Sequence, residues 1–387
     1  MKIALILNDD FSMWHFRGGL IESLVSKGME VCVIVPPGSY LSKLEAMGAR
    51  CIPIAMNRFI TPLQDLKLLS QLYCIFKAEQ FDLVHNMTIK PNIFGTIAAK
   101  LAGIPRIVCL VSGIGYVFSN DIESTEKKIV RTIATFLYKV SLSISDKTWF
   151  QNKDDLDLFI EKNIIKRNKG IVIRSGGINL TEFSLSKVNP ALLEKLRSEF
   201  HLKENSKCVV MVAARLIWSK GVREFIEASE ILKSAYPDWL FIMVCPQDPG
   251  SPDSVPKEYI DTHQSDNLIV IDSFREDIKN IIALADIMVL VSYYREGVPR
   301  TLLEGLSMSK PIITSNSVGC KEVVEDGKNG FLVPVKDSKE LAEKLKFLMD
   351  NESKRSLFGK YSREIAKNYF DETIVVNRIL TELYEIL

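Results

Sequence analysis

The segment Glu296-Gly297-Val298-Pro299-Arg300-Thr301-Leu302-Leu303-Glu304 places two carboxylates on either side of a predicted helix start. Pro299 suits the first helical position, because the missing N–H would have no helical partner there. The backbone N–H groups of residues 300–302 then point out of the helix end, where the helix dipole favours an anion. Glu296 and Glu304 can accept hydrogen bonds from hydroxyl groups nearby. The segment predicts a site for a sugar joined to a phosphate, although a surface helix with solvated charges fits the same spacing.

A second charged motif precedes the first. Arg215 and Lys220 stand five residues apart, between a predicted strand over residues 207–213 and a predicted helix over residues 222–233. Two cations after a strand suit an anionic ligand, because ligands of open parallel sheets bind beyond the carboxyl ends of the strands. The segment 296–304 also follows a predicted strand, over residues 287–291.

The elements that must position these motifs fall into two series. Apolar runs alternate with helical patterns in each series, which predicts two doubly wound α/β domains. The first series has predicted strands at 2–7, 30–35, 82–85 and 107–111, with a helix over 18–26. The second has predicted strands at 207–213, 240–244, 268–271, 287–291, 311–315 and 330–333. The turn-rich run Ser175-Gly176-Gly177-Ile178-Asn179 lies between the two series.

The length of 387 residues also favours two domains over a single core. We predict an N-terminal domain over residues 1–178 and a C-terminal domain over residues 179–365. A helical tail over residues 366–387 is expected to pack back on the first domain. No fixed-period repeat or low-complexity tract is visible.

The bulk composition excludes several classes of protein. No apolar run reaches the ~18 residues of a membrane span, and residues 1–10 lack a signal-peptide pattern, so a cytoplasmic protein is expected. Seven scattered cysteines without a Cys-x-x-Cys pair indicate reduced core residues. The formal net charge is only +1, which gives no reason to expect a nucleic-acid partner.

The charge is nevertheless unevenly distributed. Residues 1–180 contain 22 Lys/Arg and 16 Asp/Glu, whereas the remainder contains 27 and 32. A helix in the basic half combines cations with apolar residues, which suits peripheral contact with an anionic membrane on its inner face, although a solvated helix with its apolar stripe turned inward fits as well. Its residues are Lys127, Lys128, Arg131, Lys139, Ile129, Ile133, Phe136 and Leu137.

Taken together, the two charged motifs resemble family 4 of the retaining glycosyltransferases. Further resemblance comes from Trp14-His15-Phe16-Arg17, Lys90-Pro91-Asn92-Ile93-Phe94-Gly95, Val111-Ser112-Gly113-Ile114-Gly115 and Phe274-Arg275-Glu276-Asp277-Ile278. Bacterial members that extend sugars on undecaprenyl diphosphate are the most similar. The resemblance covers nearly the whole chain and implies the GT-B fold, in which two Rossmann-like domains face each other across a cleft.

The resemblance implies transfer of a sugar, an N-acetylhexosamine, from a UDP-sugar to a polyprenyl-diphosphate-linked saccharide with formation of an α linkage. Pre-placed cations would stabilise the charge that develops on the departing phosphate, which is itself a candidate to take the acceptor proton. The predicted catalytic residues are Arg215, Lys220, Glu296 and His15. The predicted donor-binding residues are Glu304, Gly297, Val298, Arg300, Thr301, Leu302, Phe274 and Arg275. The predicted acceptor-binding residues are Arg17, Gly18 and Lys90.

Some positions depart from the family pattern. The run Val244-Cys245-Pro246-Gln247-Asp248-Pro249-Gly250 replaces a Gly-rich turn, which puts contacts from that loop to the nucleotide in question. Val298 and Arg300 occupy positions that line the donor-sugar pocket, so the resemblance does not fix the sugar. His15 and His85 could each contact substrate or be satisfied, partly buried histidines.

No cofactor and no metal are expected. Asp155-Leu156-Asp157 matches the metal-binding pattern of another transferase fold, but the acids stand at a helix-start signature and suit the helix dipole instead. Gly113-Ile114-Gly115 lacks the third glycine of a dinucleotide fingerprint, which argues against an NAD oxidoreductase. The sequence is also compatible with an idle nucleotide-sugar-binding subunit of a polysaccharide-assembly complex, and with a transferase that uses a soluble acceptor.

Overall fold

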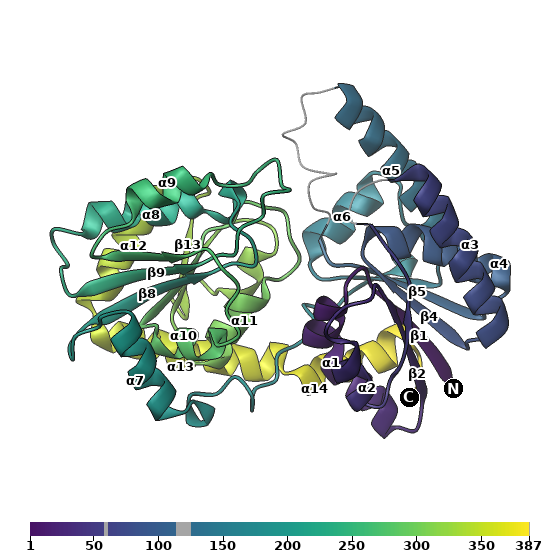
Figure 1. Cartoon of the computed structure of the whole chain (residues 1–387), viewed down its shortest axis with the longest axis horizontal. Coiled ribbons are helices and arrows are strands. Elements are labelled where there is room, and N and C mark those ends of the chain that lie inside the picture. Colours follow the sequence, from purple (N-terminus) through teal and green to yellow (C-terminus); the bar gives the residue numbers. More distant parts are fainter. Residues whose placement is uncertain (58–60, 114–124, 387) are drawn as a thin grey trace. The chain divides into compact units, whose positions relative to one another are not determined.

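Buried aliphatic strands alternate with helices along the chain and build two parallel sheets in two separate units (Figure 1). The computed structural model describes residues 1–57, 61–113 and 125–386. The N-terminal unit comprises Met1–Gly177 and Glu372–Leu387, and the C-terminal unit comprises Ile178–Asp371. The sequence places the last boundary after residue 365, whereas residues 366–371 group with the C-terminal unit.

In the described part of the N-terminal unit, seven parallel strands are ordered β3-β2-β1-β4-β5-β6-β7. The strands are β1 (Lys2–Ile6), β2 (Glu30–Val35), β3 (Arg50–Pro53), β4 (Leu83–Met87), β5 (Arg106–Val111), β6 (Lys147–Phe150) and β7 (Gly170–Val172). The helices are α1 (Asp10–Ser26), α2 (Leu41–Ala46), α3 (Pro62–Glu79), α4 (Thr96–Ala102), α5 (Thr125–Ile144), α6 (Lys153–Glu161) and α14 (Glu372–Arg378).

The period of two in each strand divides the core of this unit between the two faces of the sheet. Ile3 and Leu5 of β1 pack with residues of α1 and of the C-terminal tail, whereas Ala4 and Ile6 pack with residues of α3 and α4. Both faces of the sheet are therefore covered by helices, as a parallel sheet requires.

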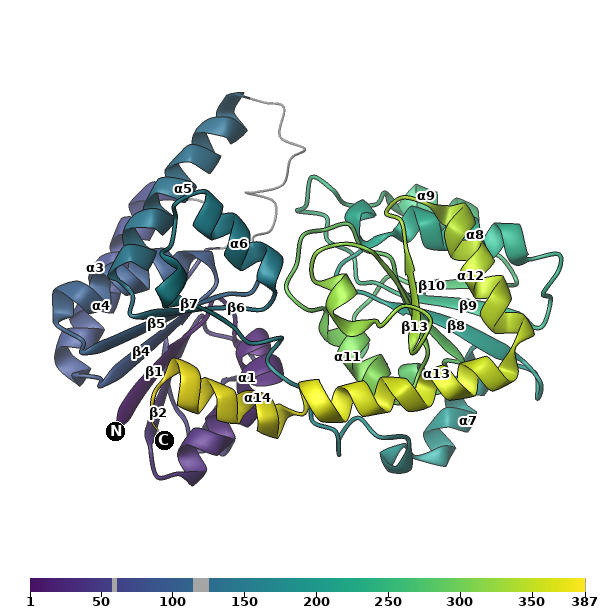
Figure 2. The same cartoon turned by 180° about the vertical axis from the view of Figure 1, so that it is seen from behind.

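The C-terminal tail belongs to the core of the N-terminal unit. Val376, Leu380 and Leu383 of the tail are buried in the cluster that contains β1 and α1 residues. Figure 2 shows α14 beside α1. At the end of the tail, the Tyr384 hydroxyl lies 2.7 Å from Nδ1 of the buried His85 on β4. The C-terminal tail thus covers, together with α1, one apolar face of the N-terminal sheet.

In the described part of the C-terminal unit, six parallel strands are ordered β10-β9-β8-β11-β12-β13. The strands are β8 (Lys207–Val212), β9 (Trp239–Val244), β10 (Leu268–Ile271), β11 (Ile287–Leu290), β12 (Ile312–Ser315) and β13 (Gly330–Val333). The helices are α7 (Pro190–Glu199), α8 (Val222–Leu232), α9 (Lys257–His263), α10 (Ile278–Leu284), α11 (Arg300–Ser307), α12 (Ser338–Asp350) and α13 (Glu352–Ile365). Every residue of β9 is buried, which fits the continuous apolar run of its sequence.

Helix α1 begins well before the predicted start at residue 18. The Asp9 carboxylate accepts a hydrogen bond from the Ser12 N–H at 2.6 Å, so Asp9 is the N-cap of a helix that begins at Asp10. The pair Gly18-Gly19, where the predicted helix begins, lies in the middle of this helix. His15 and Arg17, which precede the predicted helix, are therefore helical residues, as is Gly18.

At residues 155–157, the helix-start interpretation is confirmed. Asn152 caps α6 by accepting from the Asp155 N–H at 2.8 Å, and its own amide donates to the Asp155 carboxylate at 3.0 Å. Asp157 forms an ion pair with Lys153 on the same helix. Asp157 also lies 3.5 Å from Arg167 Nη2, so both acids have partners within the N-terminal unit.

Candidate functional site in the C-terminal unit

The strand order of the C-terminal unit reverses between β8 and β11. Chain connections run to one side of the sheet from β8 and to the other from β11, which leaves a crevice beyond their carboxyl ends. The loop after β8 carries Arg215 and Lys220, and the loop after β11 carries Glu296. The topology thus brings together the two charged motifs that the sequence singles out.

Lys220 and Glu296 meet across this crevice. Lys220 Nζ donates to Glu296 Oε2 at 2.6 Å, and the lysine is only 6% exposed. The other oxygen of Glu296, Oε1, is buried and has no hydrogen-bond partner among the described residues. A buried carboxylate oxygen favours a donor group there, and a sugar hydroxyl is a donor of the right kind.

Backbone contacts fix the two loops against each other. The Ser219 carbonyl accepts from the N–H groups of Tyr293 and Tyr294 at 2.8 and 3.0 Å. Gly221 has φ +84°, and a Cβ atom there would lie 2.5 Å from the Val291 carbonyl oxygen. Only glycine fits where the chain at residue 221 passes this close to the Val291 carbonyl. The loop that carries Lys220 therefore lies against the end of β11.

The loop after β9 holds Arg215. Asp248 forms an ion pair with Arg215, with 3.3 Å between Oδ2 and Nη1. The same loop is attached to the β8 loop by the Leu216 N–H, which donates to the Pro246 carbonyl at 2.7 Å. The loop that replaces a Gly-rich turn therefore supplies Asp248 as a counter-ion to Arg215, a predicted catalytic residue.

Tyr294 is a site residue that the sequence analysis missed. Its ring centroid lies 5.2 Å from Arg215 Cζ and 5.6 Å from Lys220 Nζ. An aromatic face attracts cations, so this ring holds both side chains near each other. The sequence offered one signal for it: Tyr294 stands two residues before Glu296 in the same loop. The analysis followed charged residues, and Tyr294 carries no charge.

Helix α11 begins one residue later than expected. Pro299 occupies the N-cap, and the Leu302 N–H donates to the Pro299 carbonyl at 3.2 Å. The prediction that the Leu302 amide points toward an anion was therefore wrong, because that amide is already bonded within the first turn. The Leu302 side chain is fully buried in the core.

The second glutamate is buried beside its own helix. Glu304 Oε1 accepts from Arg300 Nε at 3.2 Å, one helical turn away. The Arg300 guanidinium lies 5.8 Å from the ring centroid of Phe183. Arg215, Lys220 and Arg300 are thus each paired with a carboxylate of the same unit.

Gly319 shapes the loop that carries Glu296, and the sequence analysis missed it too. A Cβ atom at Gly319 would lie 1.8 Å from the Gly297 carbonyl oxygen and 2.6 Å from that of Glu296. Gly319 also has φ +86°, which glycine adopts without strain. The predicted donor residues Gly297 and Val298 are both buried at this crossing.

Comparisons with known proteins agree with this geometry. Residues 194–365 match the glycosyl transferases group 1 model, and residues 2–152 match the glycosyl transferase 4-like model. A Campylobacter jejuni protein named N,N'-diacetylbacillosaminyl-diphospho-undecaprenol alpha-1,3-N-acetylgalactosaminyltransferase is 31% identical, covering 100% of this chain and 98% of the relative. The chain belongs to the family 4 glycosyltransferases.

Further relatives and solved structures support the family and the fold. An Escherichia coli UDP-Gal:alpha-D-GlcNAc-diphosphoundecaprenol alpha-1,3-galactosyltransferase is 30% identical, covering 72% of this chain and 69% of the relative. A Rickettsia africae glycosyltransferase structure matches with a TM-score of 0.80 at 21% identity, covering 100% of this chain and 99% of that one. An Anabaena protein crystallised with UDP and glucose matches with a TM-score of 0.79 at 19% identity, covering 100% of both chains. The fold of this family 4 glycosyltransferase is GT-B.

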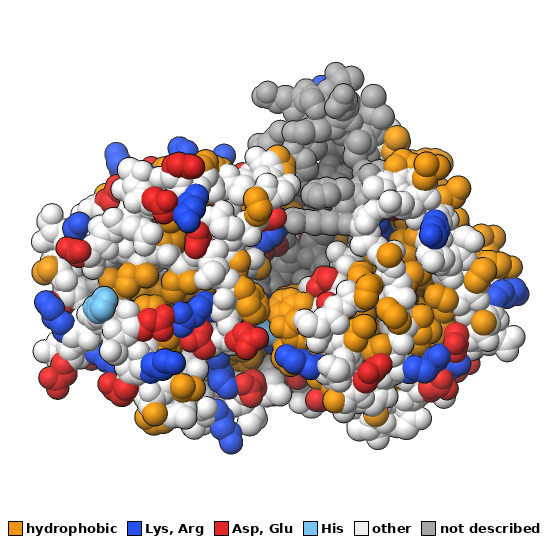
Figure 3. All heavy atoms as spheres, in the orientation of Figure 1, with side chains coloured by type: hydrophobic (Ala, Val, Ile, Leu, Met, Phe, Trp, Pro, Cys, Tyr) orange, Lys and Arg blue, Asp and Glu red, His pale blue; other side chains and the backbone are white. Residues whose placement is uncertain are grey.

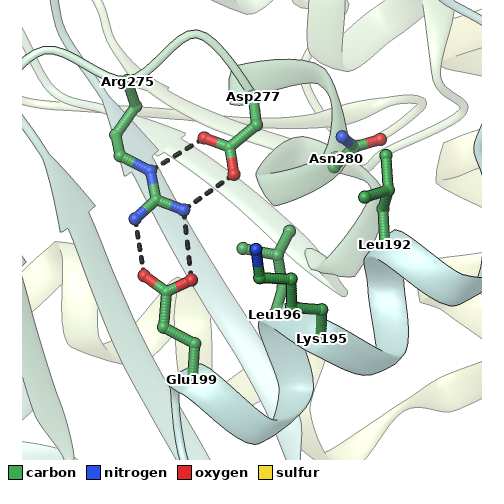
Figure 4. Close-up of a pocket in the computed structure, with 7 residues that line it drawn as sticks. All are labelled: Leu192, Lys195, Leu196, Glu199, Arg275, Asp277 and Asn280. Carbon is green, nitrogen blue, oxygen red and sulfur yellow. Dashed lines mark hydrogen bonds and ion pairs between the residues drawn. The ribbon is translucent and has the colours of Figure 1, made fainter.

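The loop after β10 contains the two predicted donor residues Phe274 and Arg275, which behave differently. Phe274 is 58% exposed. Arg275 is held by Asp277 and Glu199, and these hydrogen bonds raise the pKa of its guanidinium above the ordinary value (Figure 4). The three side chains border a pocket of about 270 Å³ next to α7. Arg275 therefore anchors the loop to α7, and its contact with a donor stays a prediction.

In this glycosyltransferase, the three predicted acceptor residues belong to the N-terminal unit, and all of them are buried. Arg17 is 5% exposed, and its guanidinium lies 5.1 Å from the Trp149 ring centroid. Gly18 packs against α2, where a Cβ atom would lie 3.2 Å from Met47 Cε. Lys90 is 8% exposed and forms an ion pair with Asp65 of α3. Binding of the acceptor by these residues stays a prediction.

The two histidines of this unit have different surroundings. His15 is half-buried on α1, and its ring stacks on Phe11 with 5.2 Å between centroids. His85 is completely buried, and its burial, aided by the nearby Arg17 cation, holds its pKa well below the ordinary 6.5. His85 is therefore a neutral core histidine bonded to Tyr384, and only His15 has a side chain that a ligand could reach.

Two further predictions remain without a test. In the part of the chain that the structure describes, no three His, Cys, Asp or Glu side chains gather as a metal site, and none of the helices is long and apolar enough to span a membrane. Residues 114–124, which include part of the run Gly113-Ile114-Gly115, lie outside the described residues, as do the side chains of Lys127, Ile129 and Arg131.

Proposed function

We propose that this glycosyltransferase moves an N-acetylhexosamine from a UDP-sugar to a polyprenyl-diphosphate-linked saccharide and forms an α linkage with retention of configuration. The observation that carries the proposal is the meeting of Arg215, Lys220 and Glu296 at the β8–β11 crevice, with Tyr294 over both cations. Two relatives of about 30% identity are named as α-1,3 transferases for sugars on diphospho-undecaprenol.

The chemistry needs no group beyond the substrates and these side chains. The bond between the anomeric carbon and the β-phosphate oxygen breaks, and UDP leaves with the electron pair. Arg215 and Lys220 stabilise the charge on that phosphate, because fixed cations in a water-poor site need no reorganisation. The acceptor hydroxyl attacks the same face, and its proton goes to the departing phosphate oxygen. Glu296 orients the sugar through its hydroxyls.

We place the reaction at the inner face of the cell membrane, where a polyprenyl-linked acceptor would be found. On the N-terminal unit, α3 exposes Leu63 (87%) and Leu66 (64%), and α5 exposes Ile133 and Phe136. Hydrophobic side chains gather over the α3 and α4 side of this unit (Figure 3). Lys67, Lys128 and Lys139 are exposed on the same helices. Apolar residues flanked by lysines suit an interface with anionic lipid.

A transfer assay tests the proposal. The purified protein is incubated with radiolabelled UDP-sugars, one at a time, a short polyprenyl-diphosphate-linked aminosugar and EDTA, and label is counted in the organic phase. We expect label from one N-acetylhexosamine donor. If no label is transferred but one UDP-sugar raises the unfolding temperature, the result would support the donor site and contradict the lipid acceptor. Loss of transfer in EDTA with recovery in magnesium would contradict the metal independence.

A further inference from the structure

An aromatic cluster on the N-terminal unit includes His15 and three residues to which no role has been assigned above. Phe11, Trp14 and His15 lie on one face of the first turns of α1, and Tyr40 precedes α2. Ring centroids lie 5.2 Å apart for Phe11 and Tyr40 and also for Trp14 and Tyr40. All four side chains are half-buried. We refer to these four residues as the aromatic platform.

The platform is held in place by polar contacts below it. The Asp10 carboxylate accepts from the Tyr40 N–H at 2.7 Å, which ties the loop before α2 to the start of α1. A Cβ atom at Gly38 would lie 2.2 Å from the same carboxylate, so glycine permits this close contact. Asp9 caps α1 on the neighbouring position. The rings therefore stand on a fixed base, which lowers the ordering cost of binding a ligand.

The position of the platform is that of a ligand site in this kind of sheet. The strand order of the N-terminal unit reverses between β1 and β4, and ligands bind beyond the strand ends at such a point. Thr88, just after β4, has φ +73° although it is β-branched, and its hydroxyl donates to Asn8 Oδ1 at 3.1 Å. Backbone strain of this kind persists at functional sites, because the surrounding structure enforces it.

The chemistry of the platform suits a sugar ring. The faces of a pyranose carry C–H groups that pack on aromatic rings, while the hydroxyls at its rim bond to polar neighbours. Lys43 supplies such a neighbour: its Nζ lies 4.7 Å from the Trp14 ring centroid and 4.3 Å from that of Tyr40. The Asp10 carboxylate, which accepts from the Tyr40 N–H, adds an acidic group next to Tyr40. A prenyl chain would make no use of these charges.

From these observations, we propose that the aromatic platform binds the sugar rings of the acceptor saccharide. The proposal rests on the proposed function, because it takes the acceptor to be a glycan. It adds the residues Phe11, Trp14, Tyr40 and Lys43 to the acceptor side, where Arg17 and Lys90 are almost completely buried. His15 enters the same platform through its stacking on Phe11.

Saturation-transfer NMR on the full chain tests this proposal without donor or turnover. The probes are di-N-acetylchitobiose for the sugar and farnesyl diphosphate for the lipid. We expect the wild type and Trp14→Phe to saturate the sugar C–H protons, and Trp14→Ala to reduce that signal at least fivefold. Tyr361→Ala, an exposed aromatic on α13, is the matched control and should retain the signal. Circular dichroism shows which variants fold. If Trp14→Ala does not fold, the test is repeated with Tyr40→Ala.

Three results would overturn the proposal: no saturation of the sugar by the wild type, an unchanged sugar signal in folded Trp14→Ala, or a loss confined to the farnesyl protons. The last would assign the platform to the lipid. With the lipid-linked acceptor, Trp14→Ala should raise the acceptor KM at least tenfold and leave the KM of the UDP-sugar unchanged. Failure of the transfer assay alone contradicts the proposed function, whereas failure of the NMR test alone contradicts the platform.

Discussion

Lys220 and Glu296 form an ion pair across the crevice between β8 and β11, with 2.6 Å between Nζ and Oε2. The two residues come from different loops, and both side chains are largely buried. Each is needed to neutralise the other in the unliganded protein. This pair therefore links the stability of the C-terminal unit to the residues that we assign to catalysis.

A double-mutant cycle should detect that link. Lys220→Met leaves the Glu296 carboxylate without its cation, and we expect it to lower the free energy of unfolding by about 2 kcal/mol, less than for a fully buried pair. Lys220→Met combined with Glu296→Gln should be more stable than Lys220→Met alone by about 1 kcal/mol, because no charge is left unpaired. The measurement is urea unfolding of the transition that UDP shifts. Strictly additive effects would show that the two groups do not interact.

Arg215 should matter for turnover more than for stability. Its removal takes away one fixed cation from the developing phosphate charge, so Arg215→Ala should lower kcat about a hundredfold, equivalent to about 3 kcal/mol. Arg223→Ala is the matched control, because Arg223 is an exposed arginine of α8 that lies 5.0 Å from the Trp218 ring centroid. The assay is transfer at saturating donor. Near-normal turnover by Arg215→Ala would remove this residue from the mechanism.

Gly319 and Gly327 both have positive φ, but only Gly319 is crowded. Comparing them separates the effect of a steric clash from that of backbone strain. Gly319→Ala would push the Cβ atom into the Gly297 carbonyl, whereas Gly327, with φ +75°, has nothing within 4 Å of the same position. Both substitutions should cost about 1 kcal/mol of stability through strain. Only Gly319→Ala should also displace Glu296 and lower kcat/KM for the donor, by tenfold or more. Equal activity of the two variants would show that the close contact does not shape the site.

Much of this architecture was accessible from local sequence pattern. The strands β2, β10 and β13 have the predicted bounds, because short apolar runs flanked by turn residues determine them locally. The placement of Arg215 and Glu296 after predicted strands was also correct, and the structure adds that these strands, β8 and β11, are neighbours in the sheet. Features that depend on neighbouring residues in the sequence, such as these strand bounds, were predicted correctly.

Contacts between residues far apart in sequence were not accessible in this way. Lys90 is neutralised by Asp65, 25 residues earlier, so its charge is not exposed. Arg17 lies against Trp149, and Arg215 pairs with Asp248. The start of α1 was missed because the Asp9 side chain that fixes it is a single capping residue. Side-chain partners are set by packing in three dimensions, which one sequence does not reveal.

Lys310 provides a prediction on pH. It is buried and donates to the carbonyls of Ala283 and Ala285, and burial lowers the pKa of its ammonium group from 10.5 to about 8. Between pH 8 and 10.5 the unfolded chain therefore binds more protons at this residue than the folded chain does. The contribution of Lys310 to the free energy of unfolding should rise with pH across this window, by on the order of 3 kcal/mol in total, and stay constant below it.

Other groups also titrate in this range, so the test compares wild type with Lys310→Met by urea unfolding from pH 7 to 10.5. We expect the free energy of unfolding of the wild type to rise relative to that of the variant above pH 8. Lys328→Met, at an exposed lysine paired with Glu325, is the matched control and should show no such rise, because the hydrogen bond to Glu325 raises the pKa of Lys328. A constant difference between wild type and Lys310→Met would mean that Lys310 keeps its proton in the folded state throughout, held by the two carbonyl groups.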